Sequence, residues 1–351
     1  MTTKATNIQY LDTLRGFATL SVIIVHVTTP VLKMMYGRNM EFWWIGNIID
    51  SCVRFVIPVF LMLSGATMLG KEYSLMEFYK KRWMRVLVPF LFWMVAYWIF
   101  RWSMLMPKEQ PKELHSILQW AVDLFFKQGI SKHLWYIYMI LCIYLFVPFM
   151  GKAIRRLSDS TILYLLMGWI LLNQAQITGL ISLASWPPFA QKLYGYLMYS
   201  GFLVLGYSLF KMRTPSNKIR YWAIIVFLLT IIVSAVATYF LSRQAHKLDT
   251  TMYGSLTLNT MLQSAALFIL LKDFTFTNRI LNWTISTMSN YSYGIYLVHI
   301  MVIDTFFRNG IFWTMAYPLI SLPVVVMLTL ITSLGIIFLL RKIPFGKYIS
   351  G

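Results

Sequence analysis

Residues 11–31 read LDTLRGFATLSVIIVHVTTPV, an apolar run that holds three ionisable side chains, Asp12, Arg15 and His26. A helix advances about 100° and about 1.5 Å per residue, so Arg15 and His26 lie roughly three turns and roughly 16 Å apart on it. Asp12, Arg15, Thr19 and His26 therefore share one face. Ionisable groups inside a bilayer are costly unless they are paired, and they mark functional sites. The stripe predicts a reaction path or a transport path.

The composition defines the class of protein around this helix. Of 351 residues, 58% are hydrophobic, 17% aromatic and 12% charged, which is too apolar for a soluble globule. The net charge of +19 arises from short basic runs between apolar segments, where the positive-inside rule expects them, so a nucleic-acid partner is not expected. Cys52 and Cys142 fall inside apolar segments, which argues against a disulfide framework.

Apolar stretches of roughly 17 to 25 residues predict membrane-spanning helices. We therefore expect an all-α polytopic membrane protein, one domain over residues 1–351, with about ten spans around a polar internal cavity. A shorter, amphipathic segment at 112–127 is predicted to lie in the membrane interface. The predicted spans are 10–32, 44–69, 84–101, 134–151, 160–177, 194–211, 221–242, 256–272, 287–306 and 318–340.

The basic residues favour one orientation in the membrane. With the N-terminus in the cytoplasm, the loops on that side hold eighteen Lys and Arg and the opposite loops hold eleven. This bias predicts that both termini are cytoplasmic. His26, His133 and His299 then fall in the outer half of the membrane, whereas His115 and His246 fall in loops and are expected to be solvated.

Each of these features has a plainer interpretation. Asp12 and Arg15 are spaced to form an i,i+3 salt bridge at the interface, and a lone intramembrane histidine such as His299 is often a packing residue. The basic run at 80–85 suits a topology anchor as well as a phosphate clamp, for which the guanidinium fork is adapted.

Two other predicted spans carry polar side chains in register. In the second, Asp50 and Arg54 are four residues apart and precede Pro58, which predicts a kinked helix that lines a cavity. In the ninth, a three-and-four spacing places polar side chains on one stripe, including Tyr296, a mid-helix hydroxyl that needs a partner, and His299.

Five motifs follow one another along these spans: YLDTLRG at 10–16, with ten residues between Arg15 and His26; RFVIPVFLMLSG at 54–65; Arg82 and Arg85 followed by Pro89; HLWY at 133–136; and YSYGIYLVH at 291–299. In this order they resemble the membrane-bound acyltransferase-3 family over almost the whole chain. The form is similar to the stand-alone bacterial O-acetyltransferases that modify surface glycans, such as those acting on enterobacterial common antigen.

The resemblance implies acetyl-coenzyme A, or another acyl-coenzyme A, as the donor substrate, without a metal. It implies a hydroxyl of a glycan or an undecaprenyl-linked sugar as the acceptor, in the bacterial inner membrane. His26 would act as a general base or a transient acyl carrier, Arg15 would hold the donor or stabilise the oxyanion, and Asp12 would orient Arg15. The donor-binding candidates are Arg82, Arg85, Arg54 and Ser64, and the acceptor-binding candidates are His133, Trp135, Tyr296 and His299.

Two interpretations from other classes remain open. A transporter or flippase for a lipid-linked polysaccharide would also have many helices and a polar stripe, but it would function without a thioester. A structural scaffold would tolerate loss of His26.

Overall fold

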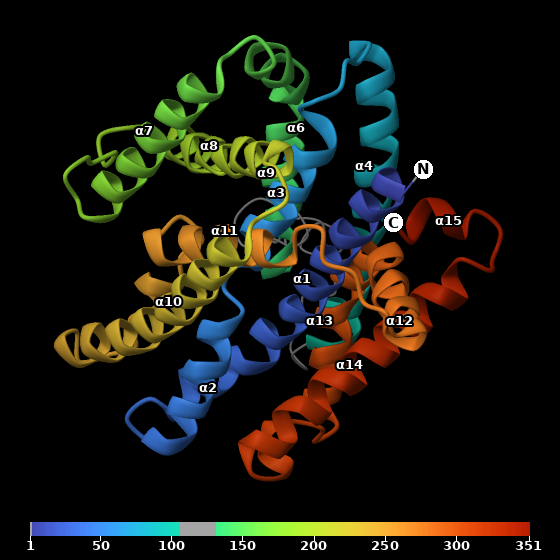
Figure 1. Ribbon diagram of the computed structural model, residues 1–351. Helices are drawn as coiled ribbons and strands as arrows, with labels where there is room; N and C mark the ends of the chain where they lie inside the picture. Colours follow the sequence, from blue (N-terminus) through green and yellow to red (C-terminus); the bar gives the residue numbers. More distant parts are fainter. Residues whose placement is uncertain (1, 106–130) are drawn as a thin grey trace.

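The computed structural model describes residues 2–105 and 131–351, and these residues form helices and connecting loops without strands (Figure 1). The interfacial helix predicted at 112–127 lies outside the described residues. Ten segments of the described chain are long and apolar enough to cross a membrane. This confirms the prediction of an all-α polytopic membrane protein.

The helices begin and end where the sequence supplies caps. Ser158, Ser216 and Asn278 accept hydrogen bonds from the first-turn amides of α7, α10 and α12 through their side chains. The α-helices are α1 (Thr2–Met35), α2 (Met40–Cys52), α3 (Val56–Met68), α4 (Leu75–Leu105), α6 (Trp135–Ile154), α7 (Asp159–Ile177), α8 (Pro188–Met198), α9 (Gly201–Lys211), α10 (Asn217–Gln244), α11 (Leu258–Leu271), α12 (Arg279–Asn290), α13 (Ser292–Arg308), α14 (Pro318–Leu340) and α15 (Gly346–Ile349). Short 3₁₀ helices are η2 (Lys132–Leu134), η3 (Thr251–Tyr253) and η4 (Trp313–Met315).

Helix α1 is the centre of the bundle. It packs against α2, α3, α12, α13 and α14, whereas α7 and α10 lie at the periphery (Figure 1). The outer face of α10 exposes large apolar side chains, among them Leu228, Leu229 and Ile232, as expected for a helix that faces lipid. The polar stripe of α1 is therefore surrounded by other helices.

The span predicted at 44–69 is interrupted in the structure. α2 ends at Cys52 and α3 begins at Val56, so Arg54 lies in the break between them. Pro58 has no amide to donate to the carbonyl of Arg54, and its ring would clash with that carbonyl in a continuous helix. The kink expected from Pro58 is thus a full break that frees Arg54 from the helix.

The span predicted at 287–306 differs in the same way. α12 ends at Asn290 and α13 begins at Ser292, so the predicted single stripe is divided between two helices. Ser289 belongs to α12, while Tyr296 and His299 belong to α13. Mean hydropathy does not reveal such a break, because it is averaged over the residues on both sides of it.

Candidate functional site

A cavity of about 780 Å³ lies inside the bundle beside α1. It is lined by α1, the α2–α3 break, α3, α4, α6, α12 and α13. Every predicted site residue lines it except Asp12 and His299, and these two contact residues that do. The lining residues from the prediction are Arg15, His26, Arg54, Ser64, Arg82, Arg85, His133, Trp135 and Tyr296.

Three guanidinium groups gather at one end of this cavity. Arg15 comes from α1, and Arg82 and Arg85 come from the first turns of α4. Arg85 is an electrostatic neighbour of Arg15, and Arg82 lies above the ring of Phe78, with 5.9 Å from its guanidinium carbon to the ring centre. Three planar cations in one cavity form a strongly electropositive end, which suits phosphate or carbonyl oxygens.

Arg15 is held by two partners. Its Nη1 donates to Asp12 Oδ1 at 3.0 Å and to Ser289 Oγ at 2.9 Å, and Ser289 Oγ donates to Asp12 Oδ1 at 2.7 Å. The i,i+3 salt bridge considered from the sequence is therefore present, and Arg15 lines the cavity as well. Ser289 closes a three-membered ring of polar contacts between α1 and α12.

The imidazole of His26 lies farther along α1, at the other end of the stripe, among two more histidines. The ring centres of His26 and His299 are 5.1 Å apart, those of His133 and His299 are 5.2 Å apart, and those of His26 and His133 are 6.5 Å apart. The three rings come from α1, η2 and α13, so the three histidines expected at similar depth do meet.

Hydrogen bonds define how two of these rings are oriented. His299 Nδ1 is 2.7 Å from the carbonyl oxygen of Tyr296, which can only accept, so Nδ1 carries the proton. His133 Nδ1 is 2.8 Å from Ser131 Oγ. The Nε2 atoms of both rings are buried and have no hydrogen-bond partner among the described residues. His299 is 0% exposed and is not among the residues that line the cavity. Its ring contacts those of His26 and His133, and its role in acceptor binding stays a prediction.

The start of α6 is tied to α13 on this side of the cavity. The hydroxyl of Tyr296 donates to the carbonyl oxygen of His133, which supplies the partner that a mid-helix tyrosine requires. The ring centres of Trp135 and Tyr199 are 5.7 Å apart, and both rings line the cavity. The wall here is aromatic, in contrast with the arginine end.

Ser64 is part of a different wall, on α3. Its hydroxyl donates to the carbonyl oxygen of Phe60 at 3.0 Å and lies 3.5 Å from the hydroxyl of Tyr144. The hydroxyl of Ser64 therefore has a hydrogen-bond partner within the protein, and the residue also lines the cavity.

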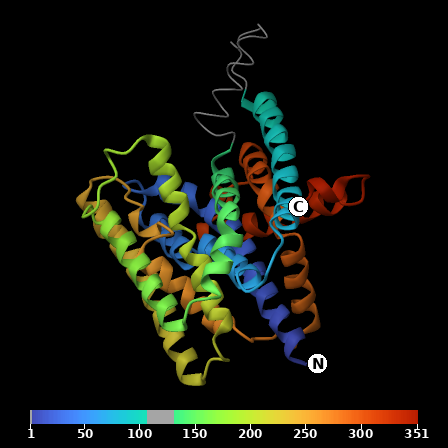
Figure 2. The same cartoon turned by 90° about the horizontal axis from the view of Figure 1, so that it is seen from above.

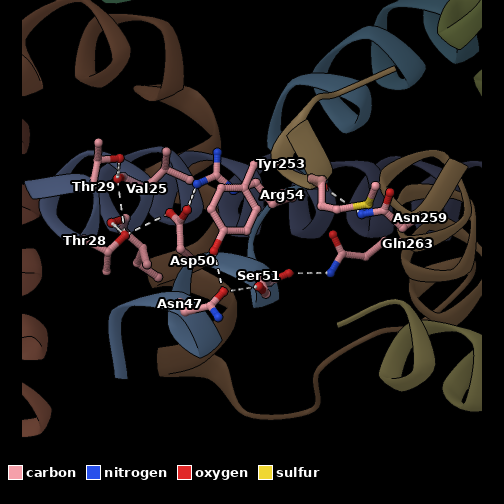
Figure 3. A network of polar contacts seen from close by, with 12 residues as sticks. Val25, Thr28, Thr29, Asn47, Asp50, Ser51, Arg54, Tyr253, Asn259 and Gln263 are labelled. Carbon is pink, nitrogen blue, oxygen red and sulfur yellow. Dashed lines mark hydrogen bonds and ion pairs between the residues drawn. The ribbon is translucent and has the colours of Figure 1, made fainter. Parts of the chain in front are cut away.

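Arg54 is the guanidinium group in the break between α2 and α3. It forms an ion pair with Asp50, whose Oδ1 also accepts from Thr28 Oγ1 at 3.0 Å (Figure 3). The guanidinium carbon of Arg54 lies 4.0 Å from the ring centre of Tyr253, a cation–π arrangement. Arg54 is an electrostatic neighbour of His26 and lines the same cavity.

A buried network of hydrogen bonds surrounds the Tyr253 ring that contacts Arg54. The hydroxyl of Tyr253 donates to Asn47 Oδ1, and Asn47 Nδ2 donates to the carbonyl oxygen of Ala235 at 3.0 Å. Gln263 Nε2 donates to the carbonyl oxygen of Ser51 at 2.8 Å (Figure 3). No periodic pattern distinguishes Tyr253, Asn47 or Gln263 in the sequence, because Asn47 lies about 200 residues before the other two.

The described residues contain no group of three or more His, Cys, Asp or Glu side chains arranged to hold a metal ion. The arrangement offers instead a cationic end, an imidazole between buried neighbours, and an aromatic wall. This set of groups suits transfer of an activated group to a hydroxyl.

Comparison with protein families decides the class. Residues 8–342 match the acyltransferase-3 family model, described as an acyltransferase domain. The chain belongs to the acyltransferase-3 family. This acyltransferase is a multi-pass membrane protein, as its family and the ten apolar spans among its described residues indicate. Neither the curated proteins nor the solved structures contain a match to it.

Proposed function

We propose that this acyltransferase is an O-acetyltransferase that moves an acyl group from acetyl-coenzyme A, or another acyl-coenzyme A, to a hydroxyl of a cell-surface or lipid-linked glycan. The observation that carries the proposal is that Arg15 and His26 line one cavity from the same helix. The motifs shared with bacterial glycan O-acetyltransferases support the choice of donor and acceptor. We place the protein in the bacterial inner membrane with both termini in the cytoplasm.

The donor enters from the arginine end. Arg82 and Arg85 bind the phosphates of the nucleotide, and the pantetheine arm extends past Arg15 and Ser64 towards His26. The path from Arg15 to His26 is roughly 16 Å along α1, which an extended arm can follow. Arg15 binds the diphosphate or the arm, or stabilises the oxyanion that develops on the thioester carbonyl.

His26 activates the acceptor. The imidazole takes the proton of the acceptor hydroxyl, whose oxygen attacks the carbonyl carbon of the thioester. The carbon–sulfur bond breaks, the coenzyme A thiolate leaves, and the proton held by His26 can neutralise that thiolate. In the covalent variant His26 first receives the acyl group and then passes it to the hydroxyl.

The acceptor lies against the aromatic wall. Trp135 and Tyr296 offer flat faces and a hydroxyl, and Arg54, neutralised by Asp50, offers guanidinium donors without a large net charge. The sequence resemblance assigns Arg54 to the donor, but its place as an electrostatic neighbour of His26 suits the acceptor better. His133 and His299 keep the His26 ring in position through the contacts described above.

The family match favours acyl transfer over the transporter and the scaffold interpretations. The proposal is tested by release of free coenzyme A thiol from acetyl-coenzyme A with purified protein and glycan acceptor, and by mass spectrometry of surface glycans for one acyl unit. We expect His26→Ala to lower turnover by about a hundredfold to ten-thousandfold.

The matched control is His246→Asn. His246 is exposed in the loop after α10 and has a φ of 53°, a backbone conformation that asparagine tolerates. This variant should turn over like the wild type. Wild-type turnover in His26→Ala would overturn the assignment, and glycans of unchanged mass with and without the gene would overturn the acceptor class.

A further inference from the structure

A second cavity of about 870 Å³ lies at the end of the bundle where α4 begins and α14 ends. Five of its lining side chains are cationic, and one, that of Glu77, is acidic. The cations are Lys80, Lys81, Arg85, Arg341 and Lys347. The proposed reaction uses only Arg85 of these, so most of the positive charge in this cavity has no assigned role.

Hydrogen bonds hold the wall of this second cavity in place. Arg341 Nη2 donates to the carbonyl oxygens of Gly351 at 2.6 Å and Asn290 at 3.1 Å, and its Nε donates to Ser350 Oγ at 3.2 Å. Trp93 Nε1 on α4 donates to the carbonyl oxygen of Ile349 at 2.9 Å. These bonds fix α15 beside α4 (Figure 2).

The place of this cavity is at the level where membrane spans end. Lys80 and Lys81 stand in the first turns of the span Leu75–Ser103, and Arg341 directly follows the span Pro318–Leu340. Cations at the ends of spans lie at the depth of lipid headgroups. The second cavity is therefore next to the phosphate layer of one leaflet.

An exposed apolar strip leads away from the cations along α4. Met84 lines the second cavity, and Leu91 and Val95 continue on the same helix face at spacings of seven and eleven residues. The three side chains are 51%, 50% and 58% exposed. Tyr348, another lining residue, is exposed, and so is nearby Phe345. A cationic cavity with an apolar strip that begins at its edge matches a molecule with an anionic head and hydrocarbon chains.

We propose that the second cavity binds the phosphate headgroup of an anionic phospholipid, with an acyl chain along Met84, Leu91 and Val95. Basic pockets between transmembrane helices bind such headgroups through charge complementarity. A nucleotide would use the cations but would leave the apolar strip without a partner. Because Arg85 and Gly351 line both cavities, the bound lipid would be a neighbour of the donor end of the first cavity.

The test is retention of lipid by the purified full-length chain. Native mass spectrometry would compare phosphatidylglycerol with zwitterionic phosphatidylcholine, added in equal amounts to the detergent-solubilised protein. We expect selective retention of phosphatidylglycerol by the wild type. The variant Lys80→Gln/Lys81→Gln/Lys347→Gln should weaken this retention by at least about tenfold.

A matched variant, Lys71→Gln/Lys152→Gln/Lys218→Gln, removes the same charge from exposed positions at the same end of the bundle, outside both cavities. It should retain phosphatidylglycerol like the wild type. Size-exclusion chromatography would check that both variants are folded, and a folded Lys347→Gln single variant with intermediate retention would give the same answer if the triple variant aggregates.

The proposal is overturned if the first triple variant retains phosphatidylglycerol like the wild type. If that variant also binds acetyl-coenzyme A more weakly in isothermal titration, the cavity is a donor subsite instead. The lipid measurement involves no acyl transfer, so it stands or fails separately from the proposed reaction.

Discussion

Replacing Asp50 with asparagine removes the carboxylate that neutralises Arg54 inside the bundle. The side chain of Asp50 is 0% exposed and that of Arg54 is 16% exposed. Breaking a buried ion pair costs about 3–5 kcal/mol because one charge stays buried without its partner. Asparagine keeps an oxygen that can accept from Thr28, and Arg54 keeps the ring of Tyr253, a contact of about 0.5–2 kcal/mol. We therefore expect the lower end, a loss of about 3 kcal/mol in the free energy of unfolding.

The assay is a double-mutant cycle with Asp50→Asn, Arg54→Met and the two combined. Unfolding of the purified proteins would be followed in increasing concentrations of denaturing detergent. The double variant carries no buried charge at this place, so it should be more stable than the sum of the single losses by about 2 kcal/mol. Strict additivity, or wild-type stability of Asp50→Asn, would refute the view that this pair is energetically coupled.

Three further outcomes are expected. Arg15→Lys keeps the charge but loses the planar fork, so the rate of coenzyme A thiol release should fall by about a hundredfold; wild-type rates would contradict this role. In Gly206→Ala the new Cβ would overlap the carbonyl oxygen of Met62, so the free energy of unfolding should drop by about 3 kcal/mol. Gly335 lies inside α14 with open space around it, so Gly335→Ala should be neutral or slightly stabilising. The pKa of Asp249 is lowered by hydrogen bonds from Thr251, so its carboxylate stabilises the fold at neutral pH and loses this effect as the pH falls through that lowered pKa. Asp249→Asn should therefore melt below the wild type at pH 7, and the difference should vanish in acid well below about pH 3.9, the ordinary pKa of aspartate.

The sequence predicted the features that depend on the spacing of residues within one segment. The polar stripe of α1 repeats at helical spacing within one segment, so Arg15 and His26 could be placed on one face before any tertiary contact was known. The number of spans follows from the same kind of local information, since each needs only a sufficiently long apolar window. Assembly of His26, His133 and His299 was suggested by their similar expected depth.

What the sequence could not predict depends on contacts between distant segments. Tyr253 contacts Arg54 and Asn47, which lie about 200 residues earlier in the chain. Nothing in the neighbourhood of Tyr253 in the sequence distinguishes it from a tyrosine at a membrane interface. The contacts of the His299 ring with His26 and His133 likewise join α13 to α1 and η2, and they depend on how these segments pack.

The helix breaks form an intermediate case. Pro58 predicts a kink, but the position of Arg54 outside both helices and on the cavity wall is seen only in the packed bundle, in which α3 lies against α9. Gly65 and Gly206 allow this packing, because a Cβ on either would lie within about 2 Å of the opposite backbone. Small residues in apolar segments do not reveal their partner helix.

The depth of His26 has a bearing on side reactions. In the proposed reaction, a thioester carbonyl that met its base at the protein surface would face bulk water as a competing nucleophile. His26 lies roughly 16 Å beyond Arg15 along α1 and lines an internal cavity, so the carbonyl would react inside the bundle. Such a chamber would conserve the cell's supply of activated acyl groups during periods when no alcohol is present to receive them.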